Sequence, residues 1–178
     1  MTRYRGVHAA ACGLVLALVM LVPARAQQAS RQASSYFIDF RSRPAYLFGH
    51  SFIVYGRLDG RGHPIESHRE GIYPLDGQAG LIMGSAVFPV PASVRAVDGD
   101  YHERASNIYR RRLSRAEYER LLWVVRGLRA SDREWNLLFK NCNDYAIEVA
   151  KGLGLTAPPS WLPPYYFVDA LRLLNGGG

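Results

Sequence analysis

Cys142 is the residue with the clearest capacity for covalent chemistry. It lies in the segment 141–144, directly before a run whose apolar residues recur at helical spacing. Asn141 is a favourable N-cap, so the pattern predicts a helix with Cys142 in its first turn and its end near Gly152 or Gly154. Unpaired backbone N–H groups and the helix dipole stabilise an anion there. We therefore expect the pKa of the Cys142 thiol to be lowered, which favours the nucleophilic thiolate.

An inert core thiol is the alternative interpretation of Cys142, because free cysteine packs well in protein interiors. Two observations favour a catalytic role. The second cysteine, Cys12, lies in an N-terminal segment that we expect to be removed, so Cys142 has no partner for an intramolecular disulfide. A lone thiol is also a liability in the oxidising compartment that such a segment implies, unless its reactivity is used.

A cysteine nucleophile needs a base, usually histidine, and a polar group that orients the base. Beyond the N-terminal segment the chain has four histidines, at positions 50, 63, 68 and 102. His50 lies in 45–56, a run of aromatic and β-branched residues that predicts a strand, and this pattern alone favours a core histidine. His63 lies next to a predicted turn and His102 in a turn-like region, so we expect both at the surface.

A β-hairpin selects the partner of His50. The glycine-rich segment 58–62 predicts the turn, and 63–73 predicts the return strand. With the turn centred near residue 60, His68 lies diagonally across from His50 on the same face of the sheet. A register slip of one residue would instead bring Glu66 close to His50.

The remaining pattern predicts strands first and helices mostly later. This order is typical of an α+β domain, in which a small antiparallel sheet packs on helices. A capping box at 114–117 marks the start of the clearest helix. The other expected elements are strands from residue 36 and at 81–90, 94–97 and 108–113, a turn at 98–100, and helices at 114–129 and 165–174.

The N-terminus predicts a cleaved secretory signal peptide over residues 1–26. Arg3 and Arg5 precede an apolar run at 9–22, and Ala24-Arg25-Ala26 matches a small-x-small cleavage site. The apolar run is too short for a comfortable membrane span. Residues 27–35 are small and polar, so we expect a disordered leader before a single domain at 36–178. The domain would be periplasmic or secreted.

Charge and ligand patterns exclude several classes of function. Removal of the signal peptide lowers the net charge from +7 by three, to +4, and the remaining basic residues are scattered except at 110–112. We interpret that triplet as a solvated face and expect no nucleic-acid partner. One cysteine and dispersed histidines lack the close ligand pairs of a structural zinc site, so we expect no metal and no cofactor.

Three segments together resemble a known family. They are 49–56 (Gly-His-Ser-Phe-Ile-Val-Tyr-Gly), 70–74 (Glu-Gly-Ile-Tyr-Pro) and 141–146 (Asn-Cys-Asn-Asp-Tyr-Ala), the last followed by Gly154-Leu155 and prolines. Their order is similar to that of circularly permuted NlpC-type papain-like proteins, in which histidine precedes cysteine. This branch includes the relatives of lecithin:retinol acyltransferase. The resemblance extends from about Phe48 to the end of the chain.

The resemblance implies a papain-like architecture and a role for each matching residue. Cys142 would be the nucleophile, His50 the general base and His68 the group that orients the base. An oxyanion could be stabilised by Tyr55, by Asn141 or by the backbone N–H of Cys142, and the sequence does not select among them.

Three functions follow as expectations. The first is a thiol hydrolase that cleaves an amide bond, with cell-wall peptide as substrate, through a thioester intermediate. The second uses the same site on a lipid acyl ester, with aromatic residues at 161 and 165–167 lining an apolar groove or contacting a membrane surface. The third is a non-catalytic binding module of the same fold.

Overall fold

The computed structural model describes residues 36–45, 48–75, 86 and 88–177. The predicted signal peptide and leader at 1–35, and most of the predicted strand at 81–90, lie outside the described residues. Within them the chain forms six strands and four helices. The strands are β1 (Tyr36–Arg43), β2 (His50–Leu58), β3 (Pro64–Pro74), β4 (Val90–Arg95), β5 (Asn107–Leu113) and β6 (Glu134–Trp135), and the helices are α3 (Asp98–His102), α4 (Arg115–Ser131), α5 (Cys142–Gly152) and α6 (Pro164–Leu174).

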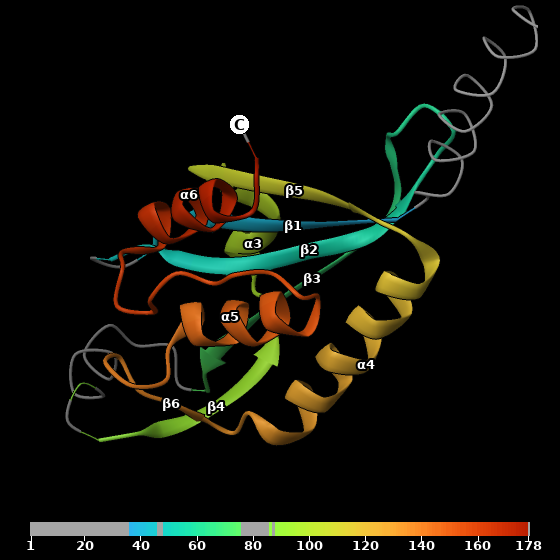
Figure 1. Ribbon diagram of the computed structural model, residues 1–178. Coiled ribbons are helices and arrows are strands. Elements are labelled where there is room, and N and C mark those ends of the chain that lie inside the picture. The colour runs from blue at the N-terminus through green and yellow to red at the C-terminus, as the bar shows by residue number, and fades with distance from the viewer. Residues whose placement is uncertain (1–35, 46–47, 76–85, 87, 178) are drawn as a thin grey trace, which may run out of the picture. The chain divides into compact units, whose positions relative to one another are not determined.

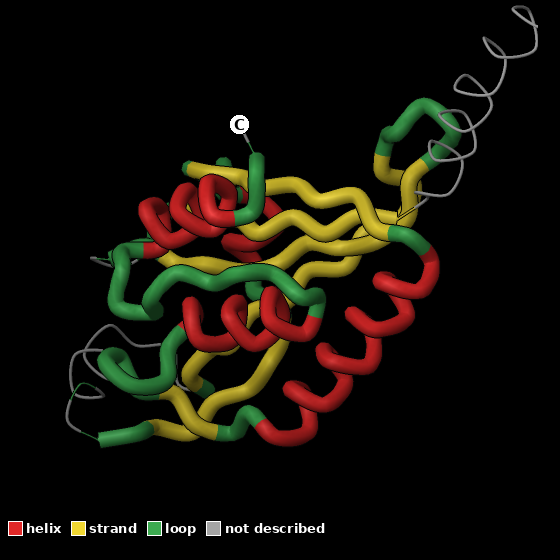
Figure 2. The backbone as a smooth tube through the Cα atoms, in the orientation of Figure 1, coloured by secondary structure: helices red, strands yellow, loops and turns green. Residues whose placement is uncertain are grey.

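The strands form one antiparallel sheet with the order β5-β1-β2-β3-β4-β6. The predicted α+β class, a small antiparallel sheet packed on helices, is therefore confirmed. The hairpin expected from the turn at 58–62 joins β2 and β3, and the strand expected at 108–113 is β5 at one edge. Figure 2 shows the strands side by side with the helices outside them.

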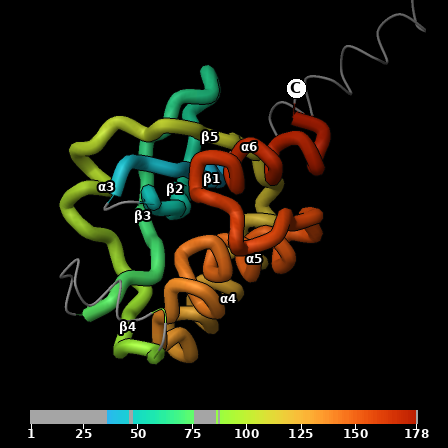
Figure 3. The backbone as a smooth tube through the Cα atoms, turned by 90° about the vertical axis from the view of Figure 1, so that its left-hand side faces the viewer, coloured from blue at the N-terminus to red at the C-terminus, as the bar shows by residue number. Residues whose placement is uncertain are grey.

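The two faces of the sheet are covered differently. Figures 1 and 3 show α5 and α6 on one face and the short α3 on the other. Side chains alternate along a strand, so Ile53 and Tyr55 of β2 point into the main core beneath the helices. Phe52 and Val54 belong to a smaller cluster on the face where α3 lies.

The predicted helix starts are confirmed by their caps. At α4, the hydroxyl of Ser114 accepts a hydrogen bond from the Glu117 backbone, and the Glu117 carboxylate accepts one from the Ser114 N–H. At α5, Asn141 caps in the same way with Asp144 at the third helical position. Both boxes satisfy N–H groups that the first turn leaves free, which fixes where each helix begins.

Segment 98–100 forms the start of helix α3 and not the predicted turn. Asp100 is buried there and accepts a hydrogen bond from the Val97 backbone N–H at 3.0 Å.

No described helix is long and apolar enough to cross a membrane.

Candidate functional site

The start of α5 places Cys142 in a polar framework. Asn143, the next residue, accepts a hydrogen bond from the Ser51 hydroxyl at 2.8 Å through its side-chain oxygen. Its amide donates to the carbonyl oxygens of Ser160 and Leu162 at 2.9 and 2.7 Å. One side chain thus joins the helix start, which carries Cys142, to β2 and to the proline-rich loop before α6.

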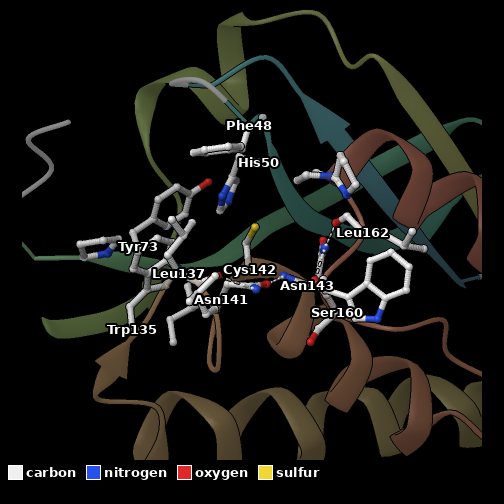
Figure 4. Close-up of a pocket in the computed structure, with 17 residues that line it drawn as sticks. Phe48, His50, Tyr73, Trp135, Leu137, Asn141, Cys142, Asn143, Ser160 and Leu162 are labelled. Atoms are coloured by element: carbon white, nitrogen blue, oxygen red, sulfur yellow. Dashed lines mark hydrogen bonds between the residues drawn. The ribbon is translucent and has the colours of Figure 1, made fainter. Parts of the chain in front are cut away.

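Cys142 and His50 line the same cavity, which has a volume of about 290 Å³. Figure 4 shows the sulfur of Cys142 pointing toward the His50 ring. The fold thus brings together the two residues that the sequence proposed as nucleophile and base. The other lining residues are Phe48, Gly49, Ile72, Tyr73, Pro74, Trp135, Leu137, Leu138, Asn141, Asn143, Ser160, Trp161, Leu162, Pro163 and Pro164.

His50 begins β2 and is buried. It follows Gly49, whose φ of 81° lies in the left-handed region that favours glycine. One face of its ring contacts Tyr73, with ring centroids 4.3 Å apart. Nε2 has no hydrogen-bond partner among the described residues and faces Gly71, where a Cβ atom would lie only 2.9 Å from it. Gly71 therefore makes room for the imidazole.

The environment of His50 keeps its imidazole neutral. Burial removes the water that would stabilise an imidazolium, and the positive charge of Arg43 disfavours it further. Arg43 is the register partner of His50 across β1 and β2. Together they lower the pKa of His50 to about 3. At neutral pH the ring is therefore uncharged and can accept a proton.

The expectation of a lowered thiol pKa at Cys142 is wrong. Burial raises the pKa of Cys142, because it removes water from the thiolate. Backbone N–H groups at the helix start lower this pKa, as the sequence predicted, and Ser51 of β2 lowers it as well, but burial has the larger effect. The resting pair is therefore a protonated thiol beside a neutral imidazole.

The predicted position of His68 is also wrong. A turn centred at residue 60 would place Phe52 opposite His68. In the structure His68 pairs with Tyr55, three residues further along β2. Because side chains alternate, this odd offset places His68 on the opposite face from His50. Its ring is half-exposed, contacts the Tyr55 ring and lies 3.1 Å from the Glu66 carboxylate. Neither His68 nor the alternative, Glu66, lines the cavity.

The structure also separates the expected oxyanion donors. The Tyr55 hydroxyl donates to the buried Glu70 carboxylate at 2.6 Å, outside the cavity. The Asn141 amide lines the cavity but donates to the Leu137 carbonyl at 3.1 Å. The backbone N–H of Cys142 belongs to the first helical turn, where the helix supplies no acceptor. Of the three candidates, it is the one best placed to receive an oxyanion.

A polar cluster behind His50 was missed by sequence reasoning. The Tyr73 hydroxyl donates to the Asp100 carboxylate, with distances of 2.5 and 2.6 Å to its two oxygens. Arg43 Nε donates to the same carboxylate at 2.9 Å. Tyr73 lies in the quoted segment 70–74, but nothing in the sequence relates it to residues at positions 43 and 100.

The chain matches no protein-family model, no curated protein and no solved structure. Within the described ranges, no three His, Cys, Asp or Glu side chains lie close enough to hold a metal ion. A thiol and a neutral imidazole share a cavity whose described lining contains no Lys, Arg, Asp or Glu, an arrangement suited to attack on an uncharged acyl group.

Proposed function

We propose that the protein is a cysteine-dependent acyl hydrolase that acts through a thioester intermediate. The single observation that carries this proposal is the meeting of Cys142 and His50, which are remote in sequence, in one cavity. Nε2 of His50, which has no hydrogen-bond partner among the described residues, adds to it, because a buried polar atom without a partner is unusual in a purely structural role.

The protonation states favour general-base catalysis. Sulfur attacks the acyl carbon while its proton passes to His50, so no thiolate has to persist in the resting cavity. His50 then gives the proton to the leaving nitrogen or oxygen, and the acyl group stays on sulfur. Water, deprotonated by His50, attacks the thioester and releases the acid together with the free thiol. Negative charge developing on the oxyanion raises the pKa of the adjacent imidazole, which assists each transfer.

The cavity favours an apolar acyl group. Its walls are formed mainly by aliphatic, aromatic and proline side chains, with Trp135, Ile72 and Leu137 among them. A charged peptide would lose hydration there without gaining an ion pair from the described residues. We therefore propose a lipid acyl ester or amide as the substrate, in preference to cell-wall peptide.

An amide of cell-wall peptide remains the second candidate. It is favoured by the predicted signal peptide, which would bring the domain to the periplasm. Incubation with phospholipid vesicles and, separately, with purified peptidoglycan, followed by mass spectrometry of the products, distinguishes the two. Release of fatty acid supports the lipid substrate, whereas release of peptide fragments supports the second candidate.

The decisive variant is Cys142→Ala, which should abolish turnover while the circular dichroism spectrum stays unchanged. His68→Gln is the matched control, because His68 lies outside the cavity and should be dispensable. Trapping the acyl group on Cys142 by acid quench and peptide mapping would show the thioester directly. Undiminished turnover in Cys142→Ala would refute the proposal.

Turnover, and not thiol reactivity, distinguishes the proposed hydrolase from a non-catalytic binding module of the same fold. Burial keeps the resting thiol protonated under either function, so slow alkylation by iodoacetamide at neutral pH is expected of both. A binding module forms no acyl adduct on Cys142 and releases no product.

A further inference from the structure

The ring of His50 is held without a hydrogen bond to Nε2 from any described residue. Its position depends on the surfaces around it. Phe52, on the same strand, has its ring centroid 6.3 Å away and nearly parallel, and Tyr73 contacts the ring at 4.3 Å. Gly71 presents no side chain, so the imidazole reaches the backbone of β3. Of these neighbours, Tyr73 is the one with a polar anchor.

The anchor of Tyr73 is rigid because several elements contribute to it. Asp100, on α3, accepts from the Tyr73 hydroxyl, from Arg43 Nε and from the Val97 backbone. Arg43, on β1, also donates to the Glu103 carboxylate at 3.0 Å. The side chains of Tyr73, Asp100 and Arg43 are all buried, which strengthens each charge-assisted bond.

We propose that Tyr73, anchored by Asp100 and Arg43, is the positioning residue of His50 and takes the role that the resemblance assigned to His68. The ring of Tyr73 fixes the plane of the imidazole by contact. Asp100 fixes the ring of Tyr73 by its hydrogen bonds. This inference rests on the proposed function in one respect, that His50 is the base.

The charges around His50 give the cluster a second effect. Arg43 is the register partner of His50 on β1, Tyr73 contacts the ring from β3 and Cys142 lines the same cavity from α5, while Asp100 and Glu103 pair with Arg43. Tyr73 and Cys142 are uncharged at neutral pH, because burial raises the pKa of both. Arg43 is thus the charge that the imidazole meets, and its two carboxylate partners hold it there. The cluster thus orients His50, and Arg43 adds to the effect of burial, which is the larger cause of the lowered pKa of His50.

Proton NMR of the His50 Hε1 resonance tests the proposal on the full chain. In the wild type this resonance should show no titration between pH 4.5 and 8. Tyr73→Leu removes the contacting ring and admits water, so the titration midpoint should rise by about one pH unit or more, and the onset of protonation should become visible near pH 4.5. Tyr73→Phe keeps the cavity wall but loses the bond to Asp100, so kcat should fall roughly 10-fold with KM nearly unchanged.

Tyr55→Phe is the matched control, because Tyr55 also donates to a buried carboxylate but lies outside the cavity. It should lower stability without moving the His50 titration. A wild-type titration in Tyr73→Leu, or an equal displacement in Tyr55→Phe, would overturn the proposal. The NMR measurement needs no turnover, so it can stand even where Cys142→Ala retains activity and the proposed function fails.

Discussion

Asp100 and Glu70 are two buried carboxylates with similar partners and different surroundings. Each accepts a hydrogen bond from a tyrosine hydroxyl and pairs with an arginine: Asp100 with Tyr73 and Arg43, Glu70 with Tyr55 and Arg129. Asp100 lies behind the cavity, next to the ring that contacts His50. Glu70 lies on the other face of the sheet, in the main core.

Each carboxylate forms a cluster with its tyrosine and its arginine. The exposure of the arginine determines how strongly water screens the charge of that cluster. The side chain of Arg43 is 6 % exposed, so its charge acts through protein on His50. The side chain of Arg129 is 51 % exposed, so water screens its charge. Glu70 also accepts a weak hydrogen bond from Tyr145 of α5, at 3.4 Å. Its cluster therefore joins β2, β3, α4 and α5, and supports the helix that carries Cys142 without reaching the cavity.

Removing the carboxylate charge should lower the free energy of unfolding more in the Asp100 cluster than in the Glu70 cluster. Asp100→Asn leaves the buried Arg43 without its closest counter-ion, so the free energy of unfolding should fall by about 3–5 kcal/mol. Glu70→Gln should cost only about 1–3 kcal/mol, because Arg129 can turn to water and both tyrosine hydroxyls keep an acceptor. Urea denaturation at pH 7 measures both values. Equal losses, or a larger loss in Glu70→Gln, would contradict the comparison.

The acid sensitivity of folding should depend on His50. Its pKa is about 3 in the folded chain and near 6.5 when unfolded, so below pH 6.5 the unfolded chain binds more protons. Stability is therefore lost as the pH falls from 6.5 toward 3, by about 1.4 kcal/mol per pH unit from this residue. His50→Gln removes this contribution, so its unfolding free energy should fall less steeply over that range.

His68→Gln provides the control for this titration. His68 is half-exposed and lies outside the cavity, so His68→Gln leaves the buried imidazole of His50 in place and its acid slope should stay close to that of the wild type. Denaturation curves at half-unit pH intervals suffice for the three proteins. A His50→Gln slope that matches the wild type would show that the buried imidazole does not determine acid sensitivity.

Much of the fold follows from local sequence patterns. The capping boxes at Ser114 and Asn141 depend on residues three positions apart, so both helix starts were predictable. The β2–β3 hairpin was predictable from its glycines and its aromatic strand. Its register was not. The turn centres at residue 61 and not at 60, which moves each pair by two residues, and the irregularity between the pairs Leu58–Pro64 and Arg57–Glu66 moves every later pair by one more.

The candidate site was predictable in its chemistry and not in its electrostatics. Residue type and helix position identified Cys142, and the strand pattern with the resemblance identified His50. The direction of the shift in the pKa of the Cys142 thiol was missed. The depth of burial causes this shift, and it is set by loops and helices that no local pattern describes. Asp100 was missed because its partners, Arg43 and Tyr73, come from strands far away in the sequence.

Two glycines test the same contrast without altering a charge. In Gly71→Ala the new methyl would lie 2.9 Å from Nε2 of His50, so the imidazole must move away from its position beside Tyr73. Turnover should fall roughly 10- to 100-fold, with a loss of about 1–3 kcal/mol in stability.

Gly127→Ala, within α4 and remote from the cavity, meets no atom within 4 Å and should add about 0.5–1 kcal/mol without changing turnover. Steady-state kinetics and thermal unfolding of both variants provide the measurements. Full activity in Gly71→Ala would mean that the imidazole can move without consequence, and the close contact of His50 with β3 would then have no part in catalysis.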